Sequence, residues 1–216
     1  MKRYGFTLAE VLITLGVIGV VSAITIPTLI QSYRNHVVET RLKKVYSVMN
    51  QAIQRAEADY GAKELWDIYS PDFYDKYYAP YIKVLKTDII DSTTWRRIYF
   101  PDGSLLLMSE YNHKDYVFYP NANNFDNINK LNDDAGSKSF LFLLNPVDKY
   151  DTERYAHFTK NKGFEPYAYD LSKDLSNLLS GNRHSCNKDA LNRGFCTYYI
   201  YINGWKIPKN YPFKVK

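Results

Sequence analysis

The sequence has few of the residues from which catalytic and metal centres are built. Only 2 of its 216 residues are cysteine and only 4 are histidine. His36, His113, His157 and His184 are far apart, and none belongs to an H-E-x-x-H zinc pattern. No nucleophile elbow, P-loop or dinucleotide-binding fingerprint is present. The sequence therefore predicts a protein that is not an enzyme and that has no resident cofactor.

A strong excess of charge of one sign is also lacking. Lysine and arginine outnumber aspartate and glutamate by 28 to 23, so the formal net charge is only +5. These charges are dispersed along the chain, whereas a nucleic-acid-binding domain usually gathers its basic residues on one face. We therefore expect no nucleic-acid partner. No second apolar stretch of membrane-spanning length follows Ile30, and no internal repeat is visible.

The first thirty residues are the most informative part of the chain. Lys2 and Arg3 form a short basic head, and residues 6–30 are apolar except for Glu10. A helix of about 20 apolar residues suffices to cross the hydrocarbon core of a membrane. A carboxylate costs roughly 2.5–3.5 kcal/mol at the centre of such a helix and less near an end. We therefore expect Glu10 to have a functional partner.

The residues around this carboxylate resemble a known signal. Gly5 followed by Phe6-Thr7-Leu8-Ala9-Glu10 is similar to the class III signal of type IV prepilins and type II secretion pseudopilins. The resemblance implies cleavage between Gly5 and Phe6 by a prepilin peptidase, and N-methylation of Phe6. It also places Glu10 where the family has the glutamate that pairs with the terminal amine of a neighbouring subunit during assembly. Pro27 stands where many pilins have a helix-kinking proline.

The same resemblance implies a fold, a location and partners. The fold is α+β and pilin-like, with a long N-terminal helix packed on an antiparallel sheet. The chain would divide into a leader (1–5), a transmembrane and assembly helix (6–30), an amphipathic continuation (31–60) and a globular domain (61–216). It would span the bacterial inner membrane once, with the globular domain in the periplasm or outside the cell. Its partners would be prepilin peptidase, other pilin or pseudopilin subunits, the inner-membrane assembly platform and membrane lipid.

Other interpretations of the N-terminus remain open. Thr7 and Glu10 fit the S/T-x-x-E pattern of a capping box, in which the carboxylate binds backbone N–H groups. An ordinary signal peptide cleaved after Ala23 would release a soluble exported ligand-binding protein. Glu10 argues against this second interpretation, because the apolar region of a signal peptide is normally uncharged. A membrane-anchored envelope protein that never polymerises is a third alternative.

The helical pattern continues beyond Pro27 as a one-sided apolar stripe. The apolar positions recur every three or four residues, at Val38, Leu42, Val45, Met49, Ile53 and Ala56. This spacing predicts one helix from about Thr7 to about Tyr60, with Gly61 as its C-terminal stop signal. Four tyrosines that follow, Tyr74, Tyr77, Tyr78 and Tyr81, are expected to pack on this helix.

The remaining sequence predicts mainly short strands. Pro101-Asp102-Gly103 is a typical hairpin turn between two apolar runs. The predicted strands are residues 95–100, 104–109, 116–119, 140–144 and 197–202. The predicted short helices are residues 63–69, 73–85 and 171–179.

Two sets of residues could form a cross-link or bind a metal. Cys186 and Cys196 lie close together in a chain expected to be exported, which favours a disulfide; zinc binding together with His184 is the alternative.

Residues 121–136 are rich in asparagine and aspartate and predict a solvated loop. Calcium is the alternative there, and the candidate ligands are Asp126, Asp133 and Asp134. No EF-hand spacing is present, so we expect no metal.

Overall fold

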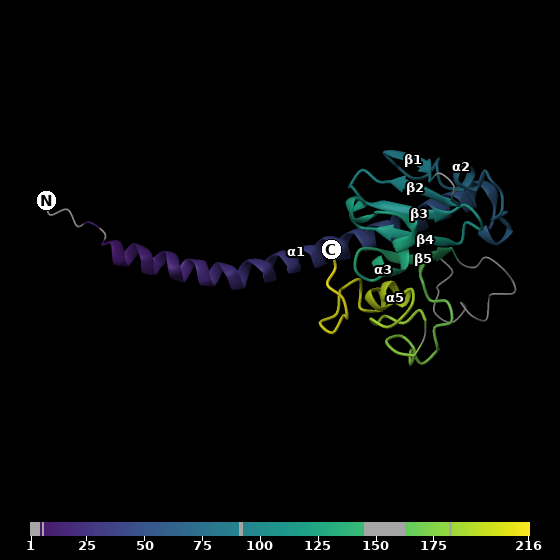
Figure 1. Cartoon of the computed structure of the whole chain (residues 1–216). Helices are drawn as coiled ribbons and strands as arrows, with labels where there is room; N and C mark the ends of the chain where they lie inside the picture. Colours follow the sequence, from purple (N-terminus) through teal and green to yellow (C-terminus); the bar gives the residue numbers. More distant parts are fainter. Residues whose placement is uncertain (1–4, 6, 91–92, 145–162, 182) are drawn as a thin grey trace.

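One long helix dominates the computed structural model, which describes residue 5 and residues 7–90, 93–144, 163–181 and 183–216. Helix α1 (Leu8–Tyr60) begins far outside the globular body and ends within it (Figure 1). Its 53 residues give a length of about 80 Å at 1.5 Å per residue. Phe6 and residues 1–4 of the predicted leader lie outside the described residues.

The two ends of α1 follow from local signals. Thr7 caps the N-terminus, and Gly61 ends the helix with a φ of 83°, a conformation that glycine adopts without strain. Pro27 lies inside the helix, which continues on both sides of it. The structure thus confirms a single helix between the predicted boundaries.

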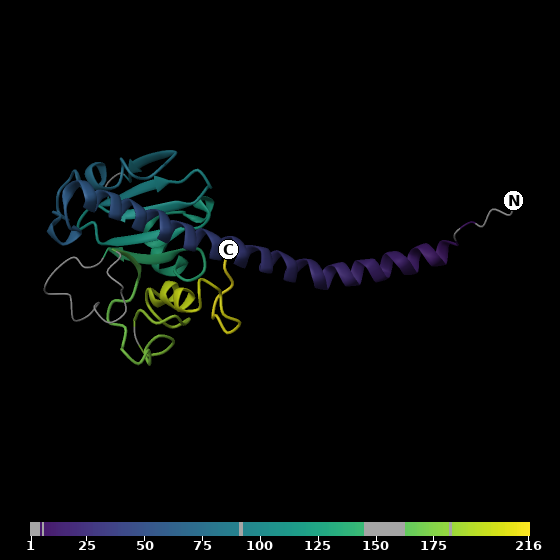
Figure 2. The same cartoon turned by 180° about the vertical axis from the view of Figure 1, so that it is seen from behind.

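The body contains one antiparallel sheet. Its six strands follow one another in chain order from edge to edge: β1 (Lys86–Ile89), β2 (Trp95–Tyr99), β3 (Leu105–Ser109), β4 (Asp115–Tyr119), β5 (Phe140–Leu144) and β6 (Phe164–Pro166). The second half of α1 crosses one face of this sheet (Figure 2). This arrangement is the predicted α+β, pilin-like fold.

The main core lies between α1 and the sheet. The predicted apolar stripe of α1 is buried throughout and packs with aromatic residues such as Phe118, Phe142 and Phe164. Burial of each such side chain contributes roughly 1.5–3 kcal/mol. Tyr74, Tyr77 and Tyr78 belong to the same core, as predicted, and Tyr81 is partly buried against it.

The free backbone of edge strand β6 is covered by α1. The Asn50 side chain donates to Phe164 O at 2.8 Å and accepts from Phe164 N at 3.1 Å, and all these groups are buried. One turn earlier, the Tyr46 hydroxyl donates to the buried Glu165 carboxylate at 3.2 Å. Burial, together with the Glu165 charge, raises the pKa of Tyr46, so the hydroxyl stays a neutral donor. The helix thereby supplies hydrogen-bond partners for the Phe164 backbone and for the Glu165 side chain at this edge.

We expect Asn50→Ala to lower the free energy of unfolding by about 2–3 kcal/mol, because it leaves the buried N–H and C=O of Phe164 unpaired. Urea unfolding of the full chain in detergent measures this loss. The exposed neighbour Gln51 supplies the control, since Gln51→Ala should stay within about 0.5 kcal/mol of the parent. Equal stability of the two variants would contradict the role of Asn50.

The remaining elements are short: η1 (Lys63–Leu65), α2 (Phe73–Tyr77), η2 (Ala122–Asn124), η3 (Ile128–Lys130), α3 (Leu131–Asp134) and α5 (Phe195–Ile202). The strand predicted for residues 197–202 is wrong, because this segment lies in helix α5. Residues 195–200 are buried without a break, so α5 has no solvent face over this run and its bulky residues show no clear helical period. It contacts β5 and β6.

Other boundaries also differ from the predictions. Residues 171–179 form turns and bends instead of a helix, and the helix predicted over residues 73–85 ends at Tyr77, three residues before Pro80. In the segment 63–69, only Lys63–Leu65 is helical, as a single 3-10 turn. Strands β1 and β6 were not predicted, since β1 is mostly polar and exposed and β6 is only 3 residues long and contains a proline.

Candidate functional site

The first half of α1 is an exposed apolar rod. Among its large apolar side chains, the exposed fraction runs from 41% at Val11 to 79% at Leu8. No residue in the most apolar stretch of this helix is buried inside the protein, and the helix is long and apolar enough to cross a membrane. Apolar surfaces of this size mark contacts with lipid or with other proteins.

Three threonine hydroxyls of this rod are satisfied within the helix itself. Thr14, Thr25 and Thr28 each donate to a backbone carbonyl three or four residues earlier, at 2.9, 2.9 and 3.3 Å. Such local bonds remove the cost of placing a hydroxyl in lipid. Glu10 is the one charged side chain between Leu8 and Ile30.

Glu10 forms a capping box with Thr7. The Thr7 amide and hydroxyl both donate to Glu10 Oε2 at 2.8 Å, and the Glu10 amide donates to Thr7 Oγ1 at 3.2 Å. The capping interpretation is thus correct for one carboxylate oxygen. Among the described residues none donates to the other oxygen, Oε1, which is free to accept from a cation. Gly5, the predicted cleavage residue, is exposed.

Helix α1 forms hydrogen bonds with the C-terminal segment where it enters the globular body. Glu39 accepts from Lys206 Nζ at 2.7 Å and from the Ile207 amide at 2.9 Å. Gln31 donates to the carbonyl of Val215 at 3.2 Å, so the C-terminal segment lies beside α1 at the point where it leaves the body (Figures 1 and 2). These contacts fix the direction of the exposed rod relative to the sheet.

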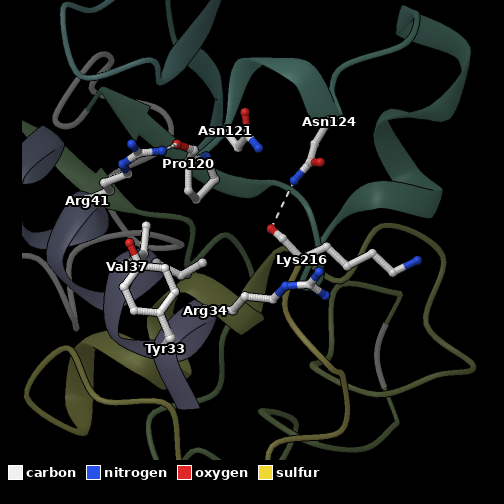
Figure 3. A pocket seen from close by; sticks show the side chains of 9 residues that line it. Tyr33, Arg34, Val37, Arg41, Pro120, Asn121, Asn124 and Lys216 are labelled. Atoms are coloured by element: carbon white, nitrogen blue, oxygen red, sulfur yellow. Dashed lines mark hydrogen bonds between the residues drawn. The ribbon is translucent and has the colours of Figure 1, made fainter. Parts of the chain in front are cut away.

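A pocket of about 370 Å³ opens at this junction (Figure 3). It is lined by Tyr33, Arg34, Val37, Val38, Arg41, Pro120, Asn121, Asn124 and Lys216. Arg41 donates to the carbonyls of Pro120 and Asp102, and Asn124 donates to the carbonyl of Lys216 at 2.9 Å. Among the described residues that line the pocket, none has a carboxylate side chain, and Arg34, Arg41 and Lys216 are basic.

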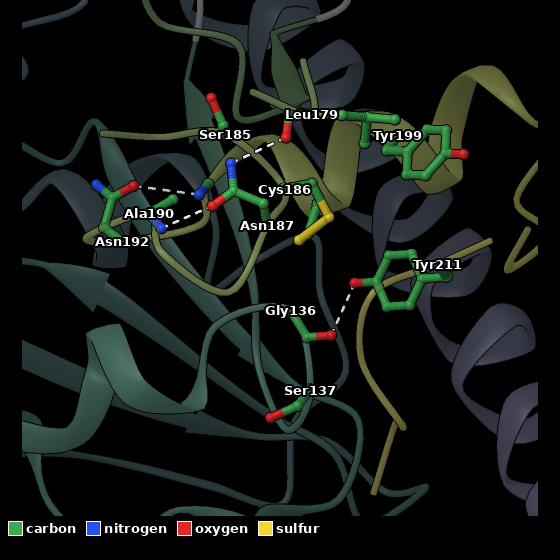
Figure 4. Close-up of a disulfide and its surroundings, with 12 residues drawn as sticks. Gly136, Ser137, Leu179, Ser185, Cys186, Asn187, Ala190, Asn192, Tyr199 and Tyr211 are labelled. Carbon is green, nitrogen blue, oxygen red and sulfur yellow. Dashed lines mark hydrogen bonds between the residues drawn. A yellow bond between two sulfur atoms is a disulfide. The ribbon is translucent and has the colours of Figure 1, made fainter. Parts of the chain in front are cut away.

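The predicted disulfide is present. Cys186 and Cys196 are bonded and buried, and they tie a loop to the first turn of α5 (Figure 4). His184 Nδ1 lies 2.8 Å from Asn192 Oδ1. The zinc alternative therefore loses its two thiolate ligands to the disulfide.

Removing the disulfide with Cys186→Ala/Cys196→Ala is expected to lower the free energy of unfolding by about 2–3 kcal/mol, the loop-closure value for a short loop. Urea unfolding with and without dithiothreitol measures the effect. The reductant should weaken the parent chain and leave the double variant unchanged. A double variant as stable as the oxidised parent would contradict this expectation.

The three aspartates considered for calcium do not share a site. Asp126 pairs with Lys130 at 2.5 Å. Asp134 is 2% exposed, pairs with Lys138 at 2.7 Å and accepts from the hydroxyl of Tyr119 at 3.1 Å. Residues 121–136 form short helical turns instead of an irregular loop, whereas residues 121–133 are exposed or half-buried, as predicted, and Asp134 is buried. Within the described ranges no three histidine, cysteine, aspartate or glutamate side chains gather as for a metal.

A partly buried polar cluster was not predicted. Arg96 donates to both oxygens of Glu110, at 2.7 and 3.2 Å, and His113 Nδ1 lies 2.6 Å from the carbonyl of Ile68. Burial raises the pKa of the Glu110 carboxyl. The hydrogen bonds and charges of the His113 ring and the Arg96 guanidinium have the larger effect, so the pKa of Glu110 lies below its ordinary value. No local motif links these residues, because only folding brings them together. The cluster joins the strands to the segment after α1, far from Glu10.

Comparisons with known proteins match two parts of the chain to two different family descriptions. Residues 1–26 match the prokaryotic N-terminal methylation motif, the prepilin-type cleavage and methylation signal of type IV pilins and pseudopilins. Residues 28–215 match a family of unknown function, DUF6613. No curated protein and no solved structure matched the chain. The protein is therefore a type IV pilin-like or pseudopilin-like chain that belongs to the DUF6613 family.

Proposed function

We propose that this chain is a structural subunit of a type II secretion pseudopilus or a type IV pilus-like filament. The observation that carries the proposal is the exposed apolar half of α1, which bears the methylation motif and a single carboxylate near its start. Prepilin peptidase cleaves the chain after Gly5, and the new terminal residue, Phe6, is methylated. The motif indicates a structural subunit rather than an enzyme.

Before assembly, the rod of residues 6–30 spans the inner membrane once. Lys2 and Arg3 stay on the cytoplasmic side, in line with the excess of basic residues on that side of membrane proteins. Residues 31–60 continue the helix into the globular domain, which then lies in the periplasm or outside the cell. The partners before and during assembly are prepilin peptidase, the assembly platform, membrane lipid and neighbouring subunits.

Assembly gives Glu10 the partner that lipid does not provide. A lone carboxylate in the hydrocarbon region is costly, and a nearby opposite charge offsets that cost. The capping box uses Oε2 only, so Oε1 is available to the methylated, positively charged amine of a neighbouring Phe6. A static anchor would carry the cost of Glu10 without this gain, which favours the filament over the anchored envelope protein.

The mature N-terminus distinguishes these functions. Intact mass and peptide spectra of the chain purified from its membrane should show a start at methylated Phe6. A soluble chain beginning at Ile24 would favour the exported binding protein instead. A chain that still carries residues 1–5 would contradict the processing step.

A further inference from the structure

A groove with a positive rim runs beside the outer face of α1. It measures about 430 Å³ and lies between α1 and the turn that joins β2 to β3. Val48, Phe100 and Pro101 supply apolar lining, and the basic side chains are Lys44, Arg55 and Lys83. None of the described lining residues is acidic, although two carboxylates contact the lining: Asp102 pairs with Lys44 at 2.8 Å, and Asp59 accepts from the Tyr81 hydroxyl.

The opposite kind of surface lies just beyond the end of α1. In residues 63–69, Leu65 is 83% exposed and Tyr69 is 63% exposed, and the carboxylates of Glu64 and Asp67 are exposed with them. Lys63 is buried and pairs with both Glu57 and Glu64 at 3.2 Å, so it balances only part of the Glu64 charge, and Asp67 adds a second exposed carboxylate. This distal loop, residues 63–69, precedes α2 at the end of the body furthest from the N-terminus (Figure 1).

We propose that the distal loop of one copy docks into the groove of the next copy in the filament. Leu65 packs on the apolar lining, and Glu64 and Asp67 face Arg55 and Lys83. Charge complementarity and the exposed leucine argue for this occupant, because apolar side chains and paired charges together define specific interfaces. The inference rests on the proposed function, since it names the contact through which the subunits recognise one another.

The contact joins two different surfaces of the same chain. Such a heterologous contact closes into a ring when the rotation between subunits permits and otherwise extends into an open helical filament with one loop and one groove free at its ends, which is the geometry that the proposed function needs. Individual surface ion pairs are weak. Repetition at every subunit, in addition to the bundled helices, makes their sum effective.

Charge reversal on either side tests the contact. The groove variant is Arg55→Glu/Lys83→Glu, and the loop variant is Glu64→Lys/Asp67→Lys. Each alone should reduce filaments about tenfold or more, because it sets like charges against each other. Electron microscopy of sheared filaments counts them, and mass spectra of the N-terminus verify that processing is unchanged.

Restoration is the decisive result. All four substitutions in one chain should restore filaments, and so should co-expression of the two variants, because each reversed loop then meets a reversed groove. Restoration also shows that the variants fold. Lys43→Glu/Lys173→Glu, two reversals at exposed lysines outside the groove, should assemble as the parent does.

Three outcomes would overturn the inference. These are normal filaments from either single-sided variant, no restoration on combining them, and an equal loss in the Lys43/Lys173 control. In each case the parent still forms filaments, so the proposed function stands without this contact. A parent chain that is processed but never found in filaments would overturn both the docking contact and the proposed function.

Discussion

Replacing Glu10 by valine is expected to abolish filament assembly while membrane insertion and cleavage after Gly5 remain normal. Valine removes the one charge of the apolar rod, so insertion becomes easier, but the amine of the neighbouring subunit then has no counter-charge. Membrane fractionation, the mass of the mature chain and filament counts measure the three steps separately. Normal filaments built only from this variant would refute the pairing.

Two companion variants separate charge pairing from helix capping, because Glu10 performs both tasks in the structure. Glu10→Gln keeps an oxygen that accepts from Thr7 but has no charge, so it should fail to assemble as the valine variant does. Thr7→Ala removes the cap, worth about 0.5–2 kcal/mol, and keeps the charge, so it should still assemble. The reverse pattern would assign Glu10 to capping alone.

Replacing Gly5 by leucine is expected to leave the precursor uncleaved. A bulky side chain at the predicted cleavage position obstructs the peptidase, and every later step requires the free amine of Phe6. Intact mass spectrometry should find residues 1–5 still attached. Gly16→Leu is the matched control, since Gly16 lies on the exposed rod with nothing within 4 Å of an added Cβ, and it should be cleaved normally. A mature-sized Gly5→Leu chain would contradict the processing proposal.

The parts of the fold that depend on neighbouring residues could be predicted from the sequence. The Thr7–Glu10 box and Gly61 mark the ends of α1, and the Asp102-Gly103 turn marks the hairpin of β2 and β3. Each signal acts within a few residues, so no tertiary information is needed. The N-terminal motif is readable for the same reason, since it is a linear signal that matches the methylation motif.

The parts that depend on distant contacts could not be predicted. Helix α5 is buried between the sheet and the disulfide loop, and complete burial removes the one-sided pattern that identifies a helix. Strand β6 pairs with β5, and Asn50, 114 positions before Phe164 in sequence, binds the backbone of its first residue, so both contacts join distant parts of the chain. The groove and the distal loop of the proposed docking contact are likewise products of the tertiary fold.

The uninterrupted course of α1 has a mechanical consequence. From Thr28 to Tyr60 the helix contains neither proline nor glycine, the residues at which helices usually bend. Its buried face is fixed to the sheet along most of this length, and Asn50 holds the edge strand. Traction applied to α1 beyond Pro27 would therefore be transmitted to the sheet through many contacts in parallel. In the proposed filament, the helix from Thr28 onward and the globular body would move together when a subunit leaves the bilayer.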